Sequence, residues 1–217
     1  MNRRAKPTKP HARGEETPLP AATPLRIIGG AYARRRLQYN GDPRTRPMKD
    51  RVREAVFNLV GPSVVGKHAI DLFAGTGALG LEALSRGAAR ATFVEQHFPT
   101  AQIIRENIAS LGIETGTEIC PANVFVWSRR LVESRDIPWV VFCSPPYDFY
   151  VSSAAEVLAL LERLLAAAPE GSIFVVEADK RFDFATLPDP QTWDIREYLP
   201  ARIGIRRSIN EPDERVR

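Results

Sequence analysis

Residues 69–80 (AIDLFAGTGALG) constrain the fold of this chain more than any other stretch. An apolar run that carries a single acid, Asp71, breaks into Gly75-Thr76-Gly77, and small and apolar residues follow. This order predicts a buried parallel strand, a tight glycine turn and the first turn of a helix. Glycines suit such a turn because a ligand has to approach the backbone closely and because some positions need a positive φ.

The spacing of Gly75, Gly77 and Gly80 fits the pattern G-x-G-x-x-G, which is typical of nucleotide cofactor sites. Glu95 follows Gly75 at the distance where an acid would meet ribose hydroxyls. Taken alone, the pattern does not choose among cofactors, and an ordinary strand–turn–helix corner, with Asp71 as a capping acid, remains the alternative.

Segments with strand-like and helical patterns alternate along the chain. The expected strands cover residues 69–73, 91–94, 118–121, 139–143, 173–176, 193–199 and 202–208, and the expected helices begin near residues 50, 78, 99 and 153. This alternation predicts an α/β fold with a seven-stranded, mostly parallel sheet and helices on both of its faces. Ligands of such folds bind at the carboxyl ends of the strands.

Charge divides the chain into a basic front part and an acidic body. Residues 1–60 hold 14 Lys and Arg but five Asp and Glu, a net charge of +9, whereas the remainder carries −5. A basic front predicts a polyanionic partner. Composition predicts a disordered tail over residues 1–24, a basic hairpin and helix over 25–60, the main domain over 61–210 and a frayed end over 211–217. For the tail, a solvated segment kept for solubility is the alternative.

Two short strand patterns, at residues 25–28 and 31–39, surround Gly29-Gly30 and predict a β-hairpin. Its second strand carries Arg34, Arg35 and Arg36, which would point to both faces of the hairpin. We expect at least one of these arginines to be packed or paired and the others to contact RNA phosphates. A solvated strand face is the alternative.

Composition also limits the kind of protein. No apolar run approaches the roughly 20 residues that span a bilayer, and the N-terminus lacks the apolar core of a signal peptide. Cys120 and Cys143 lie in strand-like contexts and are expected to be free thiols in a reducing cytoplasm. No metal-ligand spacing is present, so no metal is expected. The sequence therefore predicts a cytoplasmic protein without a membrane partner.

Three features follow strand ends in a fixed order: Asp71 with its glycine turn, then Glu95, then Ser144-Pro145-Pro146-Tyr147. A dehydrogenase would use the first two and leave the third without a role. Together they resemble the Rossmann-like methyltransferases that use S-adenosylmethionine (SAM), and among these the enzymes that methylate exocyclic or amide nitrogens. Residues 26–30, 35–37 and 45–58 are similar to the bacterial 16S rRNA guanine-N2 methyltransferase family, which modifies guanine 966. The resemblance covers residues 25–208.

The resemblance implies a set of SAM-binding residues. The turn from Asp71 to Gly77 would cradle the methionine part of SAM, with contacts from Asp71, Phe73, Gly75, Thr76 and Gly77. Glu95 would accept hydrogen bonds from both ribose hydroxyls, and Arg46 would pair with the SAM carboxylate. Asn123 would meet the adenine amine, although the family usually has Asp there and Ala122 gives an alternative register.

The resemblance also implies that Ser144, Pro145, Pro146 and Tyr147 form the catalytic motif. The family normally has Asp or Asn at the position of Ser144, whose oxygen accepts a hydrogen bond from the amine that is methylated. A serine oxygen can accept one such bond but is uncharged, and Asp148 is a candidate for compensating it. Tyr147 would stack on a flipped-out base. Arg34, Arg35, Arg36 and Arg44 would bind RNA.

The implied function is SAM-dependent methylation of a guanine N2 in 16S rRNA, by a monomer that acts on rRNA or on a small-subunit assembly particle. One alternative keeps the fold and methylates DNA adenine or a protein glutamine. Another is a SAM-fold protein that binds RNA and has lost catalysis, because Ser144 departs from the family pattern. A NAD oxidoreductase is least favoured, because no residue is identified as its hydride-transfer acid or base.

Overall fold

The computed structural model describes residues 25–39, 41–42, 45, 47–130 and 136–207 of the 217-residue chain. The predictions for the tail at residues 1–24, for the end at residues 211–217, and for Arg44 and Arg46 concern residues outside these ranges.

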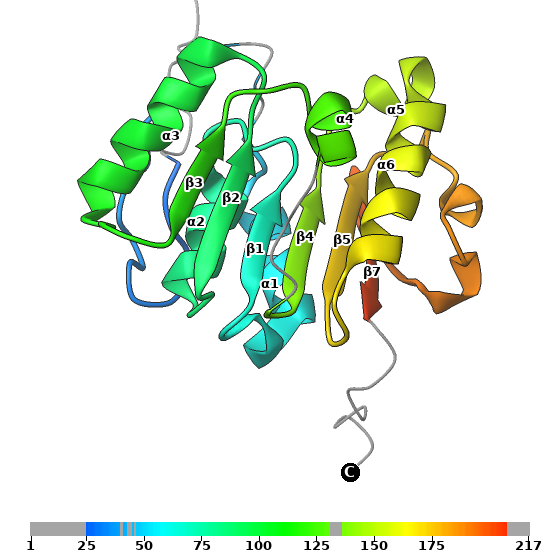
Figure 1. Cartoon of the computed structure of the whole chain (residues 1–217), viewed down its shortest axis with the longest axis horizontal. Helices are drawn as coiled ribbons and strands as arrows, with labels where there is room; N and C mark the ends of the chain where they lie inside the picture. Colours follow the sequence, from blue (N-terminus) through cyan, green and yellow to red (C-terminus); the bar gives the residue numbers. More distant parts are fainter. Residues whose placement is uncertain (1–24, 40, 43–44, 46, 131–135, 208–217) are drawn as a thin grey trace, which may run out of the picture.

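A seven-stranded sheet forms the centre of the molecule (Figure 1). Its strands are β1 (His68–Asp71), β2 (Arg90–Val94), β3 (Thr117–Cys120), β4 (Trp139–Cys143), β5 (Ile173–Ala178), β6 (Asp194–Tyr198) and β7 (Ala201–Arg207). The order across the sheet is β3-β2-β1-β4-β5-β7-β6. Strands β1 to β5 are parallel, and β7 is antiparallel to both of its neighbours. The predicted seven-stranded, mostly parallel sheet is therefore confirmed.

Helices cover both faces of this sheet. They are α1 (Asp50–Val60), α2 (Ala78–Ser85), α3 (Phe98–Leu111), α4 (Val124–Trp127), α5 (Phe149–Ser152) and α6 (Ala154–Ala167), with short 3-10 turns at Gly61–Val64, Ser128–Arg130, Phe184–Thr186 and Pro190–Thr192. Side chains of α1, α2 and α3 form one core cluster, and side chains of α6 form a second. Val140 and Val141 of β4 belong to different clusters, as expected for a strand that is buried on both faces.

The N-terminal segment, residues 25–39, is a less regular hairpin than the sequence predicts. One antiparallel bridge joins Arg26 to Arg36, and backbone hydrogen bonds join Ile27 to Arg35 and Leu37 to Leu25. The strand expected from residue 31 begins later, because residues 31–34 form a turn in which Arg34 has a φ of 70°. The amide of Ala31 donates to the Ser85 carbonyl of α2 (2.7 Å), so part of the segment bonds to the helix instead of to a partner strand.

Strands β1 to β5 all point to one edge of the sheet, which we call the carboxyl edge, and α4 and α5 lie there (Figure 1). Both cysteines are free thiols, and Cys143 is buried. Within the described ranges, no helix has the length and apolar character that crossing a membrane requires.

Candidate active site

The glycine turn joins the end of β1 to the start of α2 at the carboxyl edge. Gly75 and Gly77 have φ values of 53° and 79°, which side-chain-bearing residues rarely adopt. Gly77 is the residue before the first turn of α2, and its amide donates to the Ala74 carbonyl (2.7 Å). The predicted strand, glycine turn and helix are thus present, and the turn presents backbone groups at the edge where ligands of α/β sheets bind.

Asp71 ends β1 and is 2% exposed. Its Oδ2 accepts a hydrogen bond from the Gly80 amide (3.1 Å), so the carboxyl group holds the first turn of α2 against the strand end. The pKa of Asp71 is raised to about 7: burial raises it most, the Gly80 amide hydrogen bond opposes this, and the charge of Glu95 adds a smaller rise. Asp71 therefore stabilises the glycine turn through its hydrogen bond to the first turn of α2. Its direct contact with SAM stays a prediction.

Glu95 follows β2 and brings a half-buried carboxylate to the glycine turn. Its Oε2 accepts from the Gly75 amide (2.9 Å) and its Oε1 accepts from the His97 amide (2.8 Å). The fold thus brings together the two residues whose spacing the sequence pattern singled out. Each carboxylate oxygen has a second lone pair, so the group can still accept hydrogen bonds from two hydroxyls.

Three phenylalanine rings, Phe73, Phe125 and Phe149, form an aromatic cluster at the carboxyl edge. The ring of Phe73 meets Phe125 of α4 edge-on (6.3 Å between centroids) and Phe149 of α5 edge-on (5.9 Å). Phe125 and Phe149 are stacked at 6.4 Å. Sequence reasoning selected Phe73 but missed the other two, although both follow the ends of strands. Such rings make an apolar wall of the kind that lines small-molecule sites.

Asn123 precedes α4 and already has hydrogen-bond partners, among them Gln96, the residue after Glu95. Its Oδ1 accepts from the Phe125 amide (2.9 Å) and the Val126 amide (3.4 Å), which caps α4, and its Nδ2 donates to Gln96 (3.2 Å). An adenine amine is a donor and would compete with this cap for the same oxygen. The predicted contact of Asn123 with adenine stays a prediction.

The chain before α1 lies over the glycine turn. A Cβ atom built on Gly75 would lie 2.9 Å from the Thr45 Cγ2. Fully buried Asn107 of α3 links the same turn to the N-terminal segment: its Nδ2 donates to the Thr76 carbonyl (3.0 Å), and its Oδ1 accepts from the Gln38 amide (2.6 Å). Sequence reasoning missed Asn107, because a polar residue on the inner face of a helix indicates burial but not its partners.

The motif Ser144-Pro145-Pro146-Tyr147 follows β4, and Glu177 of β5 lies against it. Ser144 Oγ donates to Glu177 Oε2, and the Tyr147 hydroxyl donates to Glu177 Oε1 (2.6 Å). Burial and the neighbouring Glu177 carboxylate both raise the pKa of Tyr147 well above its ordinary value, so Tyr147 stays a hydrogen-bond donor. Pro145 is buried and Pro146 is exposed. Sequence reasoning missed Glu177, although an acid at the end of an apolar strand was the signal.

The structure pairs Asp148, the candidate for compensating Ser144, with another side chain. The Asp148 carboxylate accepts a hydrogen bond from Arg181 (2.9 Å), and its side chain is 86% exposed. The acid that contacts Ser144 comes from β5 instead.

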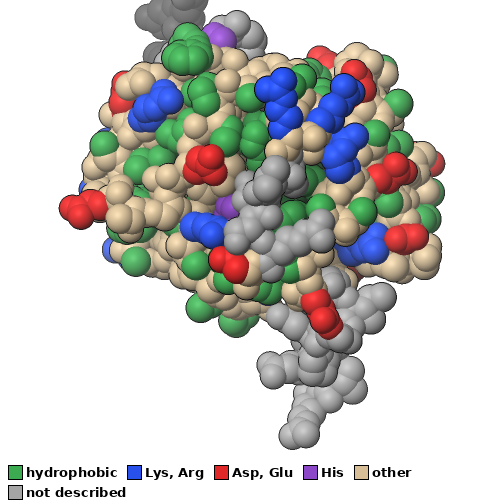
Figure 2. Space-filling model, in the orientation of Figure 1, with side chains coloured by type: hydrophobic (Ala, Val, Ile, Leu, Met, Phe, Trp, Pro, Cys, Tyr) green, Lys and Arg blue, Asp and Glu red, His purple; other side chains and the backbone are tan. Residues whose placement is uncertain are grey.

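Basic side chains lie on the N-terminal segment and near the carboxyl edge. Arg34, Arg35 and Arg36 are all exposed, and Arg35 also donates to the Ser110 carbonyl of α3. On the face of the molecule in Figure 2, several Lys and Arg side chains lie in the upper part, the end to which β1 to β5 point in Figure 1. The contact of these residues with RNA stays a prediction.

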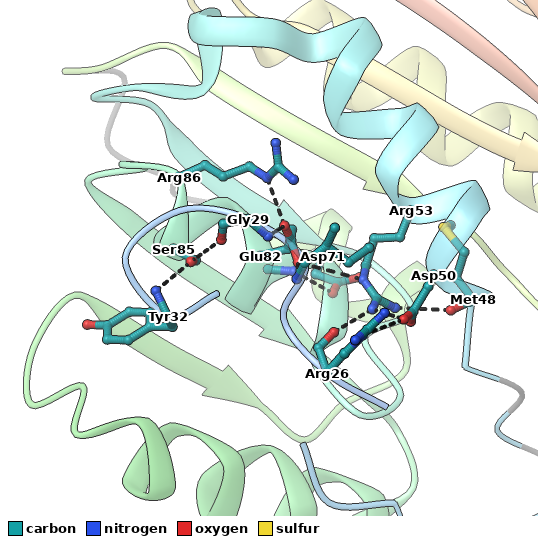
Figure 3. A network of polar contacts seen from close by, with 12 residues as sticks. Arg26, Gly29, Tyr32, Met48, Asp50, Arg53, Asp71, Glu82, Ser85 and Arg86 are labelled. Carbon is teal, nitrogen blue, oxygen red and sulfur yellow. Dashed lines mark hydrogen bonds and ion pairs between the residues drawn. The ribbon is translucent and has the colours of Figure 1, made fainter. Parts of the chain in front are cut away.

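A buried polar network holds the N-terminal segment on α2, with Glu82 at its centre (Figure 3). Glu82 accepts from the amides of Ile28 (2.7 Å) and Gly29 (2.8 Å) and from Arg86 Nε (2.8 Å). Fully buried Arg53 of α1 lies 3.8 Å from Glu82 and donates to the Arg26 carbonyl (2.6 Å). Burial lowers the pKa of Arg53, whereas the nearby acids raise it.

A family model, a curated relative and a solved structure each match most of this chain. The family model described as Conserved hypothetical protein 95 matches residues 25–197. Ribosomal RNA small subunit methyltransferase D of Escherichia coli K12 is 35% identical over 183 residues, which is 84% of this chain and 88% of that protein. A solved hypothetical protein of Thermus thermophilus has a TM-score of 0.66 at 26% identity, over 83% of this chain and 98% of that one.

A 16S rRNA N2 guanine methyltransferase of Thermus thermophilus, solved with AdoMet and guanosine, shares the fold. Its TM-score is 0.64 at 19% identity, over 88% of this chain and 52% of that one.

Proposed function

This chain belongs to the Conserved hypothetical protein 95 family, and on that premise we propose that it methylates the exocyclic N2 of a guanine in 16S rRNA. It is a SAM-dependent rRNA methyltransferase. The observation that carries the finer proposal is that the glycine turn with Glu95 and the Ser144–Tyr147 motif follow neighbouring parallel strands, β1 and β4, at the carboxyl edge. The first suits a nucleoside cofactor, and the second suits a planar base that carries an amine.

The residues at the carboxyl edge fit SAM. The left-handed glycines expose backbone groups, the Glu95 carboxylate suits a pair of ribose hydroxyls, and Phe73 lies in an aromatic cluster. When bound, SAM supplies a methyl group on a positively charged sulfur, which keeps the bonding electron pair when the methyl group leaves. We assign its binding to Glu95, the glycine turn, Phe73 and Asn123.

The chain's own contribution to the reaction is position and hydrogen bonding. The lone pair of a guanine amine is delocalised into the ring, so the amine is a poor nucleophile. Ser144 Oγ and the Pro145 carbonyl would accept its hydrogens and turn the lone pair toward the methyl group, while Tyr147 stacks on the base. As the N–C bond forms, the nitrogen releases one proton to solvent.

The finer features of the substrate belong to the proposal as well. The guanine would correspond to guanine 966 of 16S rRNA, because residues 26–30, 35–37 and 45–58 resemble the family that modifies that guanine. The acceptor would be 16S rRNA within a small-subunit assembly particle, and the enzyme would act as a monomer. Exposed Arg34 and Arg36 on the N-terminal segment would bind phosphates.

The test is mass spectrometry of 16S rRNA fragments from cells that lack this gene. We expect one guanine to lack one methyl group, and the purified protein with SAM to restore it on isolated small subunits. The variant Glu95→Ala should lose SAM binding in calorimetry and should restore nothing. Methyl transfer to DNA adenine or to a glutamine peptide, with none to rRNA, would contradict the proposal.

A further inference from the structure

We propose that Glu177 is a positioning residue for methyl transfer, which orients Ser144 and Tyr147 and lends Ser144 the negative charge that its side chain lacks. This inference rests on the proposed function and deepens it. Three features carry it: the strand register, the donor and acceptor roles of the two hydroxyls, and the burial of the carboxylate.

The register of the sheet makes the contact between Ser144 and Glu177. In the parallel pair of β4 and β5, Cys143 lies opposite Val176. The next residues along the two strands are Ser144 and Glu177, so their side chains emerge beside each other at the carboxyl edge. The Tyr147 hydroxyl reaches the other oxygen of the same carboxylate, and the Tyr150 hydroxyl donates to the Glu177 carbonyl (2.8 Å).

Both hydroxyls donate their hydrogen bonds to Glu177. A serine hydroxyl has one proton to donate and two lone pairs that accept, whereas a carboxylate only accepts. Because Ser144 donates to Glu177 Oε2, Ser144 Oγ can offer only acceptor positions to a third group. A guanine amine has only hydrogens to offer in the plane of the base. Glu177 therefore makes Ser144 the acceptor that the reaction needs.

The carboxylate also changes the electrostatics of the motif. Glu177 is 7% exposed, so its charge is little screened by water, and hydroxyl bonds to a buried charge are stronger than neutral ones. The hydrogen bond to the Glu177 carboxylate would polarise the Ser144 hydroxyl and make its oxygen a stronger acceptor for the amine. The Ser144–Glu177 pair thus places one charge and one acceptor where the family pattern has a single Asp or Asn.

Neighbouring acids do not replace Glu177. Asp148 and Asp179 both hydrogen-bond to Arg181, at 2.9 Å and 2.8 Å. The described hydrogen bonds of Ser144 and Tyr147 to an acid side chain are those with Glu177.

The first test compares single-turnover methylation of unmethylated small subunits by wild type and Glu177→Gln. The glutamine amide can donate to Ser144, which would turn the serine proton toward the amine. We expect the rate constant to fall on the order of 10²-fold, as on loss of one well-placed hydrogen bond at a reacting centre. The dissociation constant for SAM should not change. Ser144→Ala should lose a similar factor, and Glu162→Gln, which neutralises an exposed acid of α6, should behave as wild type.

The second test exchanges the charge between the two positions. Ser144→Asp alone puts two carboxylates in contact, so we expect it to be slower than wild type. Ser144→Asp combined with Glu177→Gln carries one carboxylate and one amide donor, so we expect it to be faster than either single variant. A purely structural role for Glu177 would not produce this rescue.

The outcomes separate the two levels of the proposal. Equal rates for wild type and Glu177→Gln, or a folded, SAM-binding double variant without rescue, overturn the inference and leave the proposed function standing. A wild type that binds SAM and leaves rRNA unmethylated overturns the proposed function, and the inference falls with it.

Discussion

Asp71 and Glu95 are acids at the carboxyl ends of neighbouring parallel strands, yet their surroundings differ. Asp71 is almost fully buried and accepts a hydrogen bond from the Gly80 amide. Glu95 is half-buried and accepts two amide bonds, from Gly75 and His97. A buried acid with little hydrogen bonding to its charged form holds its proton more tightly than an acid in water. At the scale of single residues, Asp71 therefore supports the turn, and Glu95 is the acid that remains open to a ligand.

The raised pKa of Asp71 predicts a pH dependence of stability. The folded-state pKa of about 7 lies above the ordinary 3.8, so unfolding releases a proton between these values. The contribution of Asp71 to the free energy of unfolding is fully present below pH 3.8 and is lost as the pH rises to about 7. The loss is up to about 1.4 kcal/mol per pH unit. Urea unfolding of wild type and Asp71→Asn measures it: from about pH 5 to pH 8 wild type should lose stability relative to the variant. Parallel pH profiles would contradict this.

At the scale of elements, the N-terminal segment depends on α2 for its position. A single antiparallel bridge and a few backbone bonds join its two arms, whereas Glu82 alone accepts from two of its amides. Gly30 approaches α2 so closely that a Cβ atom would lie 1.9 Å from the Ser85 carbonyl oxygen. The segment is therefore placed by contacts with the helix more than by its own pairing.

Glu82→Gln should release the N-terminal segment. The NH2 group of glutamine is itself a donor and would face the donors that Glu82 accepts from, and Arg53 and Arg86 would lose the negative charge of Glu82. We expect a loss of about 3 kcal/mol in the free energy of unfolding, as on breaking a buried ion pair. Hydrogen exchange should rise at Ile28 and Gly29. The control is Glu106→Gln, an exposed acid of α3. Unchanged exchange at these two amides would show that other contacts hold the segment.

At the scale of the whole molecule, charge separates a basic front part from an acidic body. Residues 1–60 carry +9, and the remainder carries −5. In the described part of this front, Arg34 and Arg36 are exposed, and Asn107 connects the same segment to the glycine turn. The N-terminal segment thus connects the surface that would bind RNA to the site that would bind SAM.

Neutralising Arg34 and Arg36 together, as Arg34→Gln with Arg36→Gln, should weaken binding of 16S rRNA and leave SAM affinity unchanged. Loss of two phosphate contacts should reduce the magnitude of the slope of log K against log salt by about 1.5 to 2. Filter binding over a range of salt concentrations measures the slope. Arg196→Gln, which neutralises an exposed arginine of β6, is the matched control. An unchanged slope would remove these arginines from the RNA interface.

Much of the fold could be predicted because its signals are local. The apolar runs at residues 139–143 and 173–176 correspond to β4 and β5, which are buried on both faces. Gly75 and Gly77 have the positive φ that the turn requires. The irregular N-terminal segment was harder to predict, because its amides bond to Glu82 and Ser85, more than 50 residues along the chain.

The sequence by itself determined where the strands end, and therefore which edge of the sheet would carry Asp71, Glu95 and Ser144, because parallel strands deliver the residues after them to a common edge. The tertiary structure alone decided which acid forms a hydrogen bond with Ser144. Asp148 is four residues away but pairs with Arg181, whereas Glu177 is 33 residues away and in contact. The physical reason is register: hydrogen bonding between β4 and β5 sets Cys143 opposite Val176, and chain proximity carries no information about that pairing.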